Sequence, residues 1–370
     1  MLTFLFTITA VHAADDIVFV GNSYTIGNDL AAKVQQVYAD AGDAATASRL
    51  AAGGLNLADH ASRAADTGSA WHTKLVTEAA DREWVVLQDQ SQIPGFPVTQ
   101  PEWVASRDGA LALDALISSA GAETVFFLTW GRRDGDAMND WLFPDFTTMQ
   151  DLLTAGYGLY AEACAGVDRP VWTAPVGPAF AKIHDDIAAT GADPTASDSL
   201  FYALYSGDGS HPSGLGTQLA AYVFYASLTG NTPVGLPVPS GLDADQTATI
   251  QEAAESVVFD PTDGFDFPWE TTETSDTGSP DEAEDTGEAH GNGDSGDAED
   301  DAEDDAEDDA EDDAEDSGSA EDNGVVGGSG AVSSAESEKS SGCSAIPSRS
   351  TPAMLLVAVF GLIGWRQRRA

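Results

Sequence analysis

The sequence predicts an open three-layer α/β/α sandwich built on a parallel sheet, as in flavodoxin-like domains. Two features predict it. Short apolar runs alternate along the chain with longer stretches rich in Ala and Leu at helical spacing, and several of the short runs stop abruptly at turn residues. This alternation places helices on both faces of a sheet and opens a site at the carboxyl ends of its strands. We expect a disordered acidic tail and a short hydrophobic C-terminal segment to follow the domain.

Five apolar runs are candidate strands because they are too short for helices and are rich in β-branched or aromatic residues. Two of them, Ile17–Val20 and Trp84–Leu87, are continuously apolar, as expected of strands buried on both faces. The run near Ala45–Leu50 is weaker because polar residues interrupt it. In chain order the candidates are Ile17–Val20, Ala45–Leu50, Trp84–Leu87, Thr124–Thr129 and Val171–Ala174.

The stretches between these strands, and two stretches after them, have the composition and length of helices. The last two would close the domain. In chain order the predicted helices are Asp29–Ala41, Ala70–Ala80, Ser106–Ala120, Thr147–Ala165, Leu215–Leu228 and Asp243–Val257.

Two segments far apart in the chain carry the strongest functional signal. The first strand stops at Gly21-Asn22-Ser23, which predicts a tight turn with the Ser23 hydroxyl at the carboxyl edge of the sheet. Asp208 stands three residues before His211, on a loop that contains Gly and Pro and precedes a predicted helix. A serine hydroxyl becomes a nucleophile when an imidazole takes its proton, and a carboxylate orients that imidazole. Ser23, His211 and Asp208 are therefore the predicted catalytic residues.

This pair of motifs resembles the SGNH (GDSL-like) hydrolase family, whose nucleophile lies in Gly-Asp-Ser after the first strand and whose late Asp-x-x-His completes a triad. The resemblance covers roughly residues 16–260. The segments Leu-Gln-Asp-Gln-Ser at 87–91, Thr-Trp-Gly at 129–131 and Ala-Pro-Val-Gly at 174–177 are similar to a poorly characterised bacterial branch. One departure stands in the first motif, where Asn22 replaces the usual Asp.

The resemblance also implies an oxyanion hole. Its donors would be the N–H of Ser23, the N–H of Gly54 in the segment Ala-Gly-Gly-Leu-Asn at 52–56, and a side-chain amide. The family supplies that amide from Gly-x-Asn-Asp, whereas this chain has Gln-Asp-Gln-Ser-Gln at 88–92. Gln90 is our first candidate for the third donor, and Gln92 is the alternative.

The resemblance implies a serine esterase that works through an acyl-enzyme and needs no metal or organic cofactor. We expect a monomer acting on a small-molecule or polysaccharide ester, with O-acetyl groups on carbohydrate favoured over lipids. The alternative is a non-catalytic surface module that uses the same scaffold to bind glycans or neighbouring cells. The replacements at Asn22 and at the Gln-rich segment are its main support.

Several other residues have a functional and a plainer interpretation. Ser91 and Ser210 lie beside the motifs, and we expect both to be structural. We also expect three histidines at the surface: His60, His72 and His184. Three residues that follow a strand would either line the substrate cleft or serve as core and solvent-exposed residues: Trp130, Arg132 and Arg133. Aromatic residues in irregular stretches often line clefts, and the candidates are Phe96, Trp141 and Phe143.

The charge of the chain excludes one class of partner. It holds 62 acidic against 15 basic residues, a formal net charge of −47 at pH 7. Phosphate backbones would repel such a chain, so nucleic-acid binding is not expected. Acidity is densest in 263–341, which has little apolar content and repeats Asp-Asp-Ala-Glu. Its like charges oppose a helix, so we predict a disordered, extended linker.

Both ends of the chain suggest export. Residues 1–13 hold an apolar run and a small-residue cleavage site, an atypical signal peptide because no Lys or Arg precedes the run. Residues 342–370 hold Gly342-Cys343, a short apolar stretch and three terminal arginines. That combination resembles the MYXO-CTERM sorting signals of myxobacterial surface proteins, and a plain membrane anchor is the alternative. We therefore expect a hydrolase domain at 14–262, held at the cell surface or outer envelope through the C-terminal segment and its sorting machinery.

Overall fold

The computed structural model describes residues 14–79, 82–166, 169–260 and 264–271. Internal contacts divide the chain into two units, Met1–Asp285 and Thr286–Ala370, and every described residue belongs to the first. The predicted signal peptide at 1–13 and C-terminal segment at 342–370 lie outside the described residues, as does the acidic linker apart from its first few positions.

Five parallel strands form a single sheet in the order β2-β1-β3-β4-β5. All five lie where the sequence predicts them: β1 Asp15–Gly21, β2 Ala45–Ala51, β3 Trp84–Leu87, β4 Glu123–Phe127 and β5 Trp172–Ala174. The apolar runs of β1 and β3 become central strands because their side chains are buried on both faces, whereas the edge strand β2 is only partly buried. Ile17 and Phe19 pack into one hydrophobic cluster, whereas Val18 and Val20 pack into the other.

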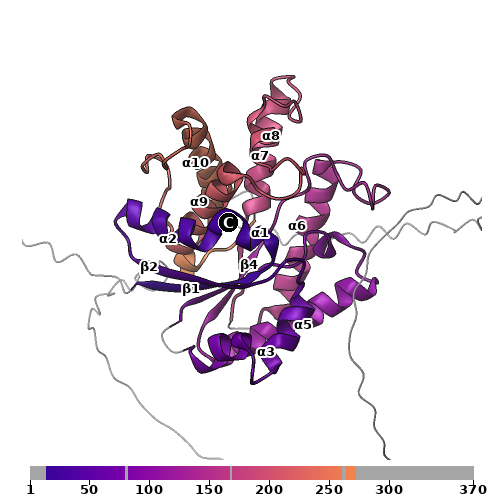
Figure 1. The fold of residues 1–370 in the computed structure, drawn as a ribbon, viewed down its shortest axis with the longest axis vertical. Helices are drawn as coiled ribbons and strands as arrows, with labels where there is room; N and C mark the ends of the chain where they lie inside the picture. The colour runs from indigo at the N-terminus through magenta and orange to yellow at the C-terminus, as the bar shows by residue number, and fades with distance from the viewer. Residues whose placement is uncertain (1–13, 80–81, 167–168, 261–263, 272–370) are drawn as a thin grey trace, which may run out of the picture. The chain divides into compact units, whose positions relative to one another are not determined.

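Helices cover both faces of this sheet, which confirms the predicted three-layer sandwich. Figure 1 shows α2, α9 and α10 on one side of the sheet and α3 and α5 on the other. The helices are α1 Ser23–Ile26, α2 Leu30–Ala41, α3 Leu57–Ala65, α4 Ala70–His72, α5 Pro101–Ser119, α6 Phe146–Cys164, α7 Val176–Ala189, α8 Leu200–Ala203, α9 Gly214–Thr229 and α10 Ala244–Phe259. Short 3-10 turns, η1 Gly27–Asp29, η3 Ile93–Gly95 and η4 Pro268–Thr271, and one π turn, η2 Thr73–Thr77, complete the described elements.

One predicted helix, Ala70–Ala80, is helical only as far as Thr77 and is not a regular α-helix. The chain forms only the three-residue α4 and then a π turn, closed by the bond from the N–H of Glu78 to the carbonyl of Thr73 at 2.8 Å. The Thr73 hydroxyl also donates to the carbonyl of Ser69 at 3.0 Å. Such competing hydroxyl bonds and β-branched residues disfavour a regular helix here. Four helices, the longer α3 and α7 and the short α1 and α8, lie in stretches for which no helix was predicted.

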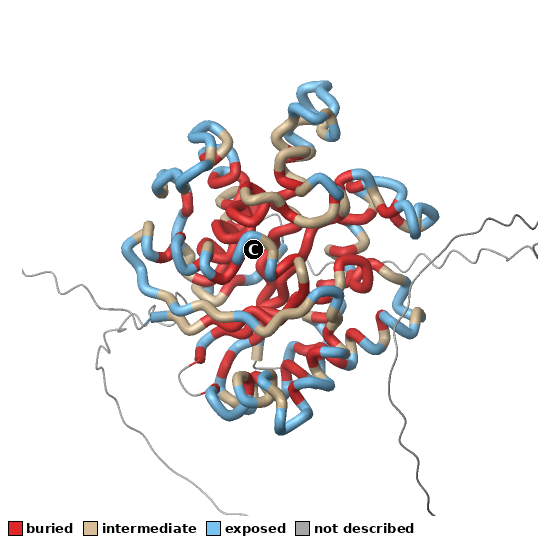
Figure 2. The backbone as a smooth tube through the Cα atoms, viewed as in Figure 1, coloured by how far each residue is buried: buried red, intermediate tan, exposed pale blue. Residues whose placement is uncertain are grey.

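The helix α9 is buried along its whole length, from Leu215 to Leu228. Figure 2 shows buried residues gathered in the sheet and along this helix. Every side of α9 is covered, so the loop that enters its N-terminus is attached to a fully buried helix. None of the described helices is long and apolar enough to cross a membrane.

The described structure continues beyond the predicted domain boundary at 262. Phe267 is buried, and its ring stacks on Trp269 with centroids 5.6 Å apart. Trp269 also lies against Phe259 at the end of α10, at 5.5 Å, and against Gly230, where a Cβ atom would come within 2.7 Å of the indole. Residues 264–271 therefore contribute to the hydrophobic core.

Candidate active site

The candidate site lies at the carboxyl edge of the sheet, where the chain order reverses between β1 and β3. In open parallel sheets this switch point opens a crevice in which ligands bind. The loop after β1 carries Ser23, and the loop after β3 carries the segment at 88–92. The sheet order thus brings the predicted nucleophile and the predicted oxyanion loop to neighbouring strand ends.

The turn after β1 is tight enough to require glycine. A Cβ atom at Gly21 would lie 2.2 Å from Thr25 Oγ1 and 2.5 Å from Gln88 Oε1. Asn22 then caps α1, its side-chain oxygen accepting the N–H of Tyr24 at 3.1 Å. Ser23 opens this short helix, so its hydroxyl leaves the sheet edge at a fixed angle.

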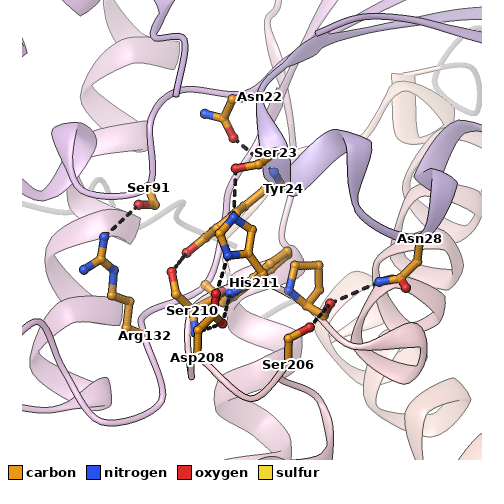
Figure 3. A network of polar contacts seen from close by, with 12 residues as sticks. Asn22, Ser23, Tyr24, Asn28, Ser91, Arg132, Ser206, Asp208, Ser210 and His211 are labelled. Atoms are coloured by element: carbon orange, nitrogen blue, oxygen red, sulfur yellow. Dashed lines mark hydrogen bonds and ion pairs between the residues drawn. The ribbon is translucent and has the colours of Figure 1, made fainter. Parts of the chain in front are cut away.

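The structure brings Ser23, His211 and Asp208 into one hydrogen-bonded chain (Figure 3). Ser23 Oγ lies 2.9 Å from His211 Nε2, and His211 Nδ1 lies 2.6 Å from Asp208 Oδ2. Burial opposes the charge on Asp208, but hydrogen bonds from His211 and from the N–H groups of Ser210 and His211 lower its pKa below the usual value. The carboxylate is therefore ionised at neutral pH and can only accept, so Nδ1 carries the proton and Nε2 is free to accept the serine proton.

These catalytic candidates are not enclosed. The side chains of His211 and Asp208 are 43% and 50% exposed. Their orientation therefore depends strongly on the loop that carries them.

Asn22, the departure from the family motif, has a structural reason. Its Nδ2 donates to the carbonyl of Leu55 at 2.9 Å and to the carbonyl of Asp89 at 3.2 Å, and its side chain is buried. Both acceptors stand beside predicted oxyanion residues, Gly54 and Gln90. An Asp at position 22 could not make either donation, so the amide ties three loops of the site together.

Asp89 is a second junction between these loops, and the sequence analysis did not assign it a role. It is fully buried, and one carboxyl oxygen accepts the N–H of Leu57 at 3.0 Å and the N–H of Gln90 at 2.8 Å. The hydroxyls of Ser106 and Tyr160 complete its shell at 3.0 and 3.1 Å. Burial raises the pKa of Asp89 to about 6, although these hydrogen bonds oppose the rise.

The three predicted oxyanion residues differ in what surrounds them. Gly54 lies in an exposed turn with a φ of +75°, a conformation that favours glycine. The side-chain oxygen of Gln90 accepts the N–H of Gln92 at 2.8 Å, and its NH₂ group has no hydrogen-bond partner among the described residues. Gln92, in contrast, donates its NH₂ group to the buried carboxylate of Asp136. Of the two glutamines, only Gln90 has its NH₂ group free to donate.

Trp130 and Arg132 were expected either to line the substrate cleft or to be core and solvent-exposed residues. Trp130 is buried, with its ring between Tyr24 and Phe180, so it belongs to the core beneath the site. Arg132 pairs with the buried Asp136 at 2.7 Å and reaches Ser91 at 3.4 Å.

Among the aromatic candidates, Phe143 is fully buried and stacks on Phe96, whereas Trp141 is 68% exposed. His60 is fully buried, contrary to the prediction, because it lies on the inner face of α3, where Nδ1 accepts from Trp71 Nε1 at 2.9 Å. Within the described ranges, no group of three His, Cys, Asp or Glu side chains is arranged to hold a metal ion.

Comparison with known proteins gives a consistent fold. No protein-family model matches the chain, and no curated protein matches it. Among solved structures, a DUF4886 family protein from Bacteroides uniformis is 14% identical with a TM-score of 0.55, over 70% of this chain and 99% of that one. That similarity shows a shared fold.

Two further solved structures are more distant in shape. A protein from Slackia heliotrinireducens described as a candidate SGNH hydrolase is 25% identical with a TM-score of 0.42, over 58% of this chain and 98% of that one. A psychrotrophic esterase from Pseudoalteromonas sp. is 15% identical with a TM-score of 0.37, over 58% and 96%.

Proposed function

We propose that this chain is an SGNH-type serine esterase that hydrolyses ester bonds through an acyl-enzyme. The observation that carries the proposal is the hydrogen-bonded chain from Ser23 through His211 to Asp208. Nucleophile, base and orienting carboxylate stand in the order and at the distances that acyl transfer requires.

The reaction would proceed in two halves. Ser23 Oγ attacks the ester carbonyl while its proton passes to His211 Nε2, and the positive charge on the imidazole is balanced by Asp208. The tetrahedral intermediate collapses as His211 returns that proton to the leaving alcohol, which leaves an acyl group on Ser23. Water then attacks this acyl group with His211 as base, and the acid product leaves as Ser23 is restored.

The negative oxygen of each intermediate needs hydrogen-bond donors. We assign this task to the N–H groups of Ser23 and Gly54 and to the NH₂ group of Gln90. The assignment is supported by the two buried junctions, Asn22 and Asp89, which hold the loops of Gly54 and Gln90 against the nucleophile turn. One such donor is worth about 3 kcal/mol in the transition state.

For the substrate, we propose an ester group carried on a carbohydrate. The half-exposed histidine and aspartate leave the nucleophile open to groups on a large molecule. Trp141 is an exposed aromatic side chain, a type that stacks on sugar rings. The rival hypothesis, a surface module that binds without catalysis, predicts binding to glycans with no turnover.

Hydrolysis of p-nitrophenyl acetate and labelling by a p-nitrophenyl phosphonate test the proposal. Ser23→Ala should abolish both without lowering the thermal unfolding midpoint, while Ser91→Ala, which removes a nearby hydroxyl, should keep them. His211→Ala should be nearly as damaging because triad members act as a unit. Asp208→Asn should retain some activity. Wild-type protein that is folded yet neither turns over nor is labelled would favour the binding module.

We also propose that the domain is exported and displayed from the cell envelope on its acidic linker. Support comes from the sequence at 1–13, 263–341 and 342–370. Deleting 344–370 should release the enzyme into the medium with unchanged specific activity. An enzyme that stays inside the cell in both forms would contradict export.

A further inference from the structure

The loop that carries His211 is held at every backbone carbonyl from Gly209 to Pro212. The carbonyl of Gly209 accepts the N–H of Arg133 at 2.9 Å, and that of Ser210 accepts Trp130 Nε1 at 3.0 Å. The carbonyl of His211 accepts the N–H of Ser206 at 2.8 Å. Since nearly half of the His211 side chain is exposed, these backbone bonds do much to fix where the imidazole lies.

Two of the residues that hold this loop belong to the nucleophile segment. On the C-terminal side of His211, Asn28 Nδ2 donates to the carbonyl of Pro212 at 3.0 Å and to Thr217 Oγ1 at 3.0 Å, and Thr217 is a buried residue of α9. On the N-terminal side, the hydroxyl of Tyr24 lies 2.7 Å from Ser210 Oγ. Figure 3 shows Asn28 and Tyr24 on either side of the His211 loop.

The conformation of Asn28 gives a second, independent observation. Asn28 has a φ of 51° and Asp29 a φ of 57°, the only residues other than glycine with positive φ in the described part of the chain. Such a left-handed conformation costs about 1–2 kcal/mol per residue, less for Asn and Asp, and strain of this kind clusters at functional sites. Here it turns the chain so that the Asn28 carboxamide faces the loop of the base.

The Tyr24 ring adds contacts on the other side. It stacks on Trp130 with centroids 4.8 Å apart and an interplanar angle of 5°, and it meets the His211 ring edge-on at 5.4 Å. Trp130 is the residue whose indole N–H holds the carbonyl of Ser210. One aromatic stack therefore supports both the loop and the imidazole.

We propose that Asn28 and Tyr24 are positioning residues for His211: from the same turn that presents Ser23, they hold the loop of the base on both sides. Neither touches the reacting atoms. Their effect is to keep His211 Nε2 within reach of Ser23 Oγ although the imidazole is partly exposed. This inference rests on the proposed esterase function.

The first test uses two neighbouring left-handed residues of the full-length protein. Asn28→Gly removes the carboxamide and keeps the backbone conformation. Asp29→Gly is the matched control, because it relieves the same strain but removes only the exposed pair with Arg49. Asn28→Gly should lower kcat for p-nitrophenyl acetate about tenfold with little change in KM, since small displacements of a catalytic group are costly. Asp29→Gly should leave kcat unchanged.

The second pair tests Tyr24. Tyr24→Phe keeps the ring stack and loses the bond to Ser210, so kcat should fall several-fold. Tyr225→Phe is its control, because that hydroxyl, 2.9 Å from Asp43 Oδ2, lies at the other end of α9 from the His211 loop. In a His211→Ala background, Asn28→Gly and Tyr24→Phe should cause no further loss of kcat, because a positioning residue acts only through the group it positions. Equal losses with and without His211 would overturn the inference.

One further measurement does not depend on activity. The downfield ¹H resonance of the His211 Nδ1–H, identified by its loss in His211→Ala, should broaden by faster exchange in Asn28→Gly and stay sharp in Asp29→Gly. If wild-type protein lacks esterase activity and labelling, the proposed function fails while this readout still tests the positioning. Identical resonances in the two glycine variants would overturn the positioning role even in an active esterase.

Discussion

At the scale of single residues, the sequence predicted that Ser23, His211 and Asp208 come together, but it did not predict which residues support them. Gly21-Asn22-Ser23 and the Asp208–His211 spacing are local patterns. The backbone geometry of each segment determines how its side chains point. The roles of Asn28 and Asp89 depend on which loops meet at the sheet edge. That meeting is set by the strand order, which no local pattern contains.

Asn22 offers a direct test at this scale. Asn22→Asp replaces a buried donor with a carboxylate facing two carbonyl oxygens, those of Leu55 and Asp89. We expect a loss of about 1–3 kcal/mol in the free energy of unfolding, the cost of unsatisfied buried polar groups. Asn56→Asp is the control, because Asn56 only accepts at the N-cap of α3, where Asp serves equally well. Urea titrations would compare them, and equal small effects would contradict the assigned role of the amide.

A pair of substitutions can also distinguish the roles of Gln90 and Gln92. If Gln90 is the third oxyanion donor, Gln90→Ala should lower kcat about 10²–10³-fold with little change in KM. Gln92→Ala should instead reduce stability, since it removes a donor from the buried carboxylate of Asp136, and should leave kcat nearly unchanged. Steady-state kinetics and thermal unfolding of both variants would decide. The opposite pattern would assign the role to Gln92.

At the scale of elements, continuous apolar runs predicted the buried strands β1 and β3 because central parallel strands are covered on both faces. The edge strand β2 is only partly buried, and its run is interrupted by polar residues. The helices were harder to predict from the sequence. The α3 signal was present in the capping box formed by Asn56 and Asp59, but the short amphipathic stretch after it was not assigned. His60 was consequently expected at the surface. The predicted helix at Ala70–Ala80 shows another case, in which composition correctly favoured a helix but did not show that its second half is a π turn.

Asp89 joins three elements, and its pKa makes their stability depend on pH. Its folded pKa of about 6 lies above the usual value of 3.8 for Asp, because burial penalises the charged form. The contribution to stability is therefore fully present below about pH 4 and is lost as pH rises through 6, a change of about 3 kcal/mol. Groups with lowered pKa, such as Asp208, act in the opposite direction.

A comparison of Asp89→Asn with wild type isolates the effect of the Asp89 charge on the free energy of unfolding. The amide can keep the bonds from Leu57 and Gln90 on its oxygen and donate to Tyr160, as the protonated acid does. The variant should match wild type at pH 4 and be more stable at pH 7.5. Guanidinium unfolding at both values would measure it, and a variant less stable at pH 7.5 would show that the charge itself holds the loops.

At the scale of the whole molecule, the sequence predicted one domain with its boundary at a shift in composition. The last large apolar residues of the described structure, Phe265, Phe267 and Trp269, stand just after that shift and still reach the core. Composition averages over a window, so it does not register three aromatic side chains at the start of an acidic segment.

The contribution of this extension can be measured in the full-length chain. Phe267→Ala should lower the free energy of unfolding by about 3 kcal/mol, the usual cost of removing a buried phenyl ring. Trp141→Ala, which removes an aromatic side chain that is 68% exposed, should change it by less than about 0.5 kcal/mol. Chemical denaturation of the two variants would compare them. A silent Phe267→Ala would place the end of the folded domain before 264.

The exposure of His211 and Asp208 has a consequence for how a polymer would be processed. A catalytic pair that stands at the surface does not require the end of a chain to be threaded through a tunnel. Interior units of a long polysaccharide could approach Ser23 sideways and depart after each turnover. Partly reacted polymer should then carry its unsubstituted units scattered along its length, rather than in a continuous block that starts from one terminus.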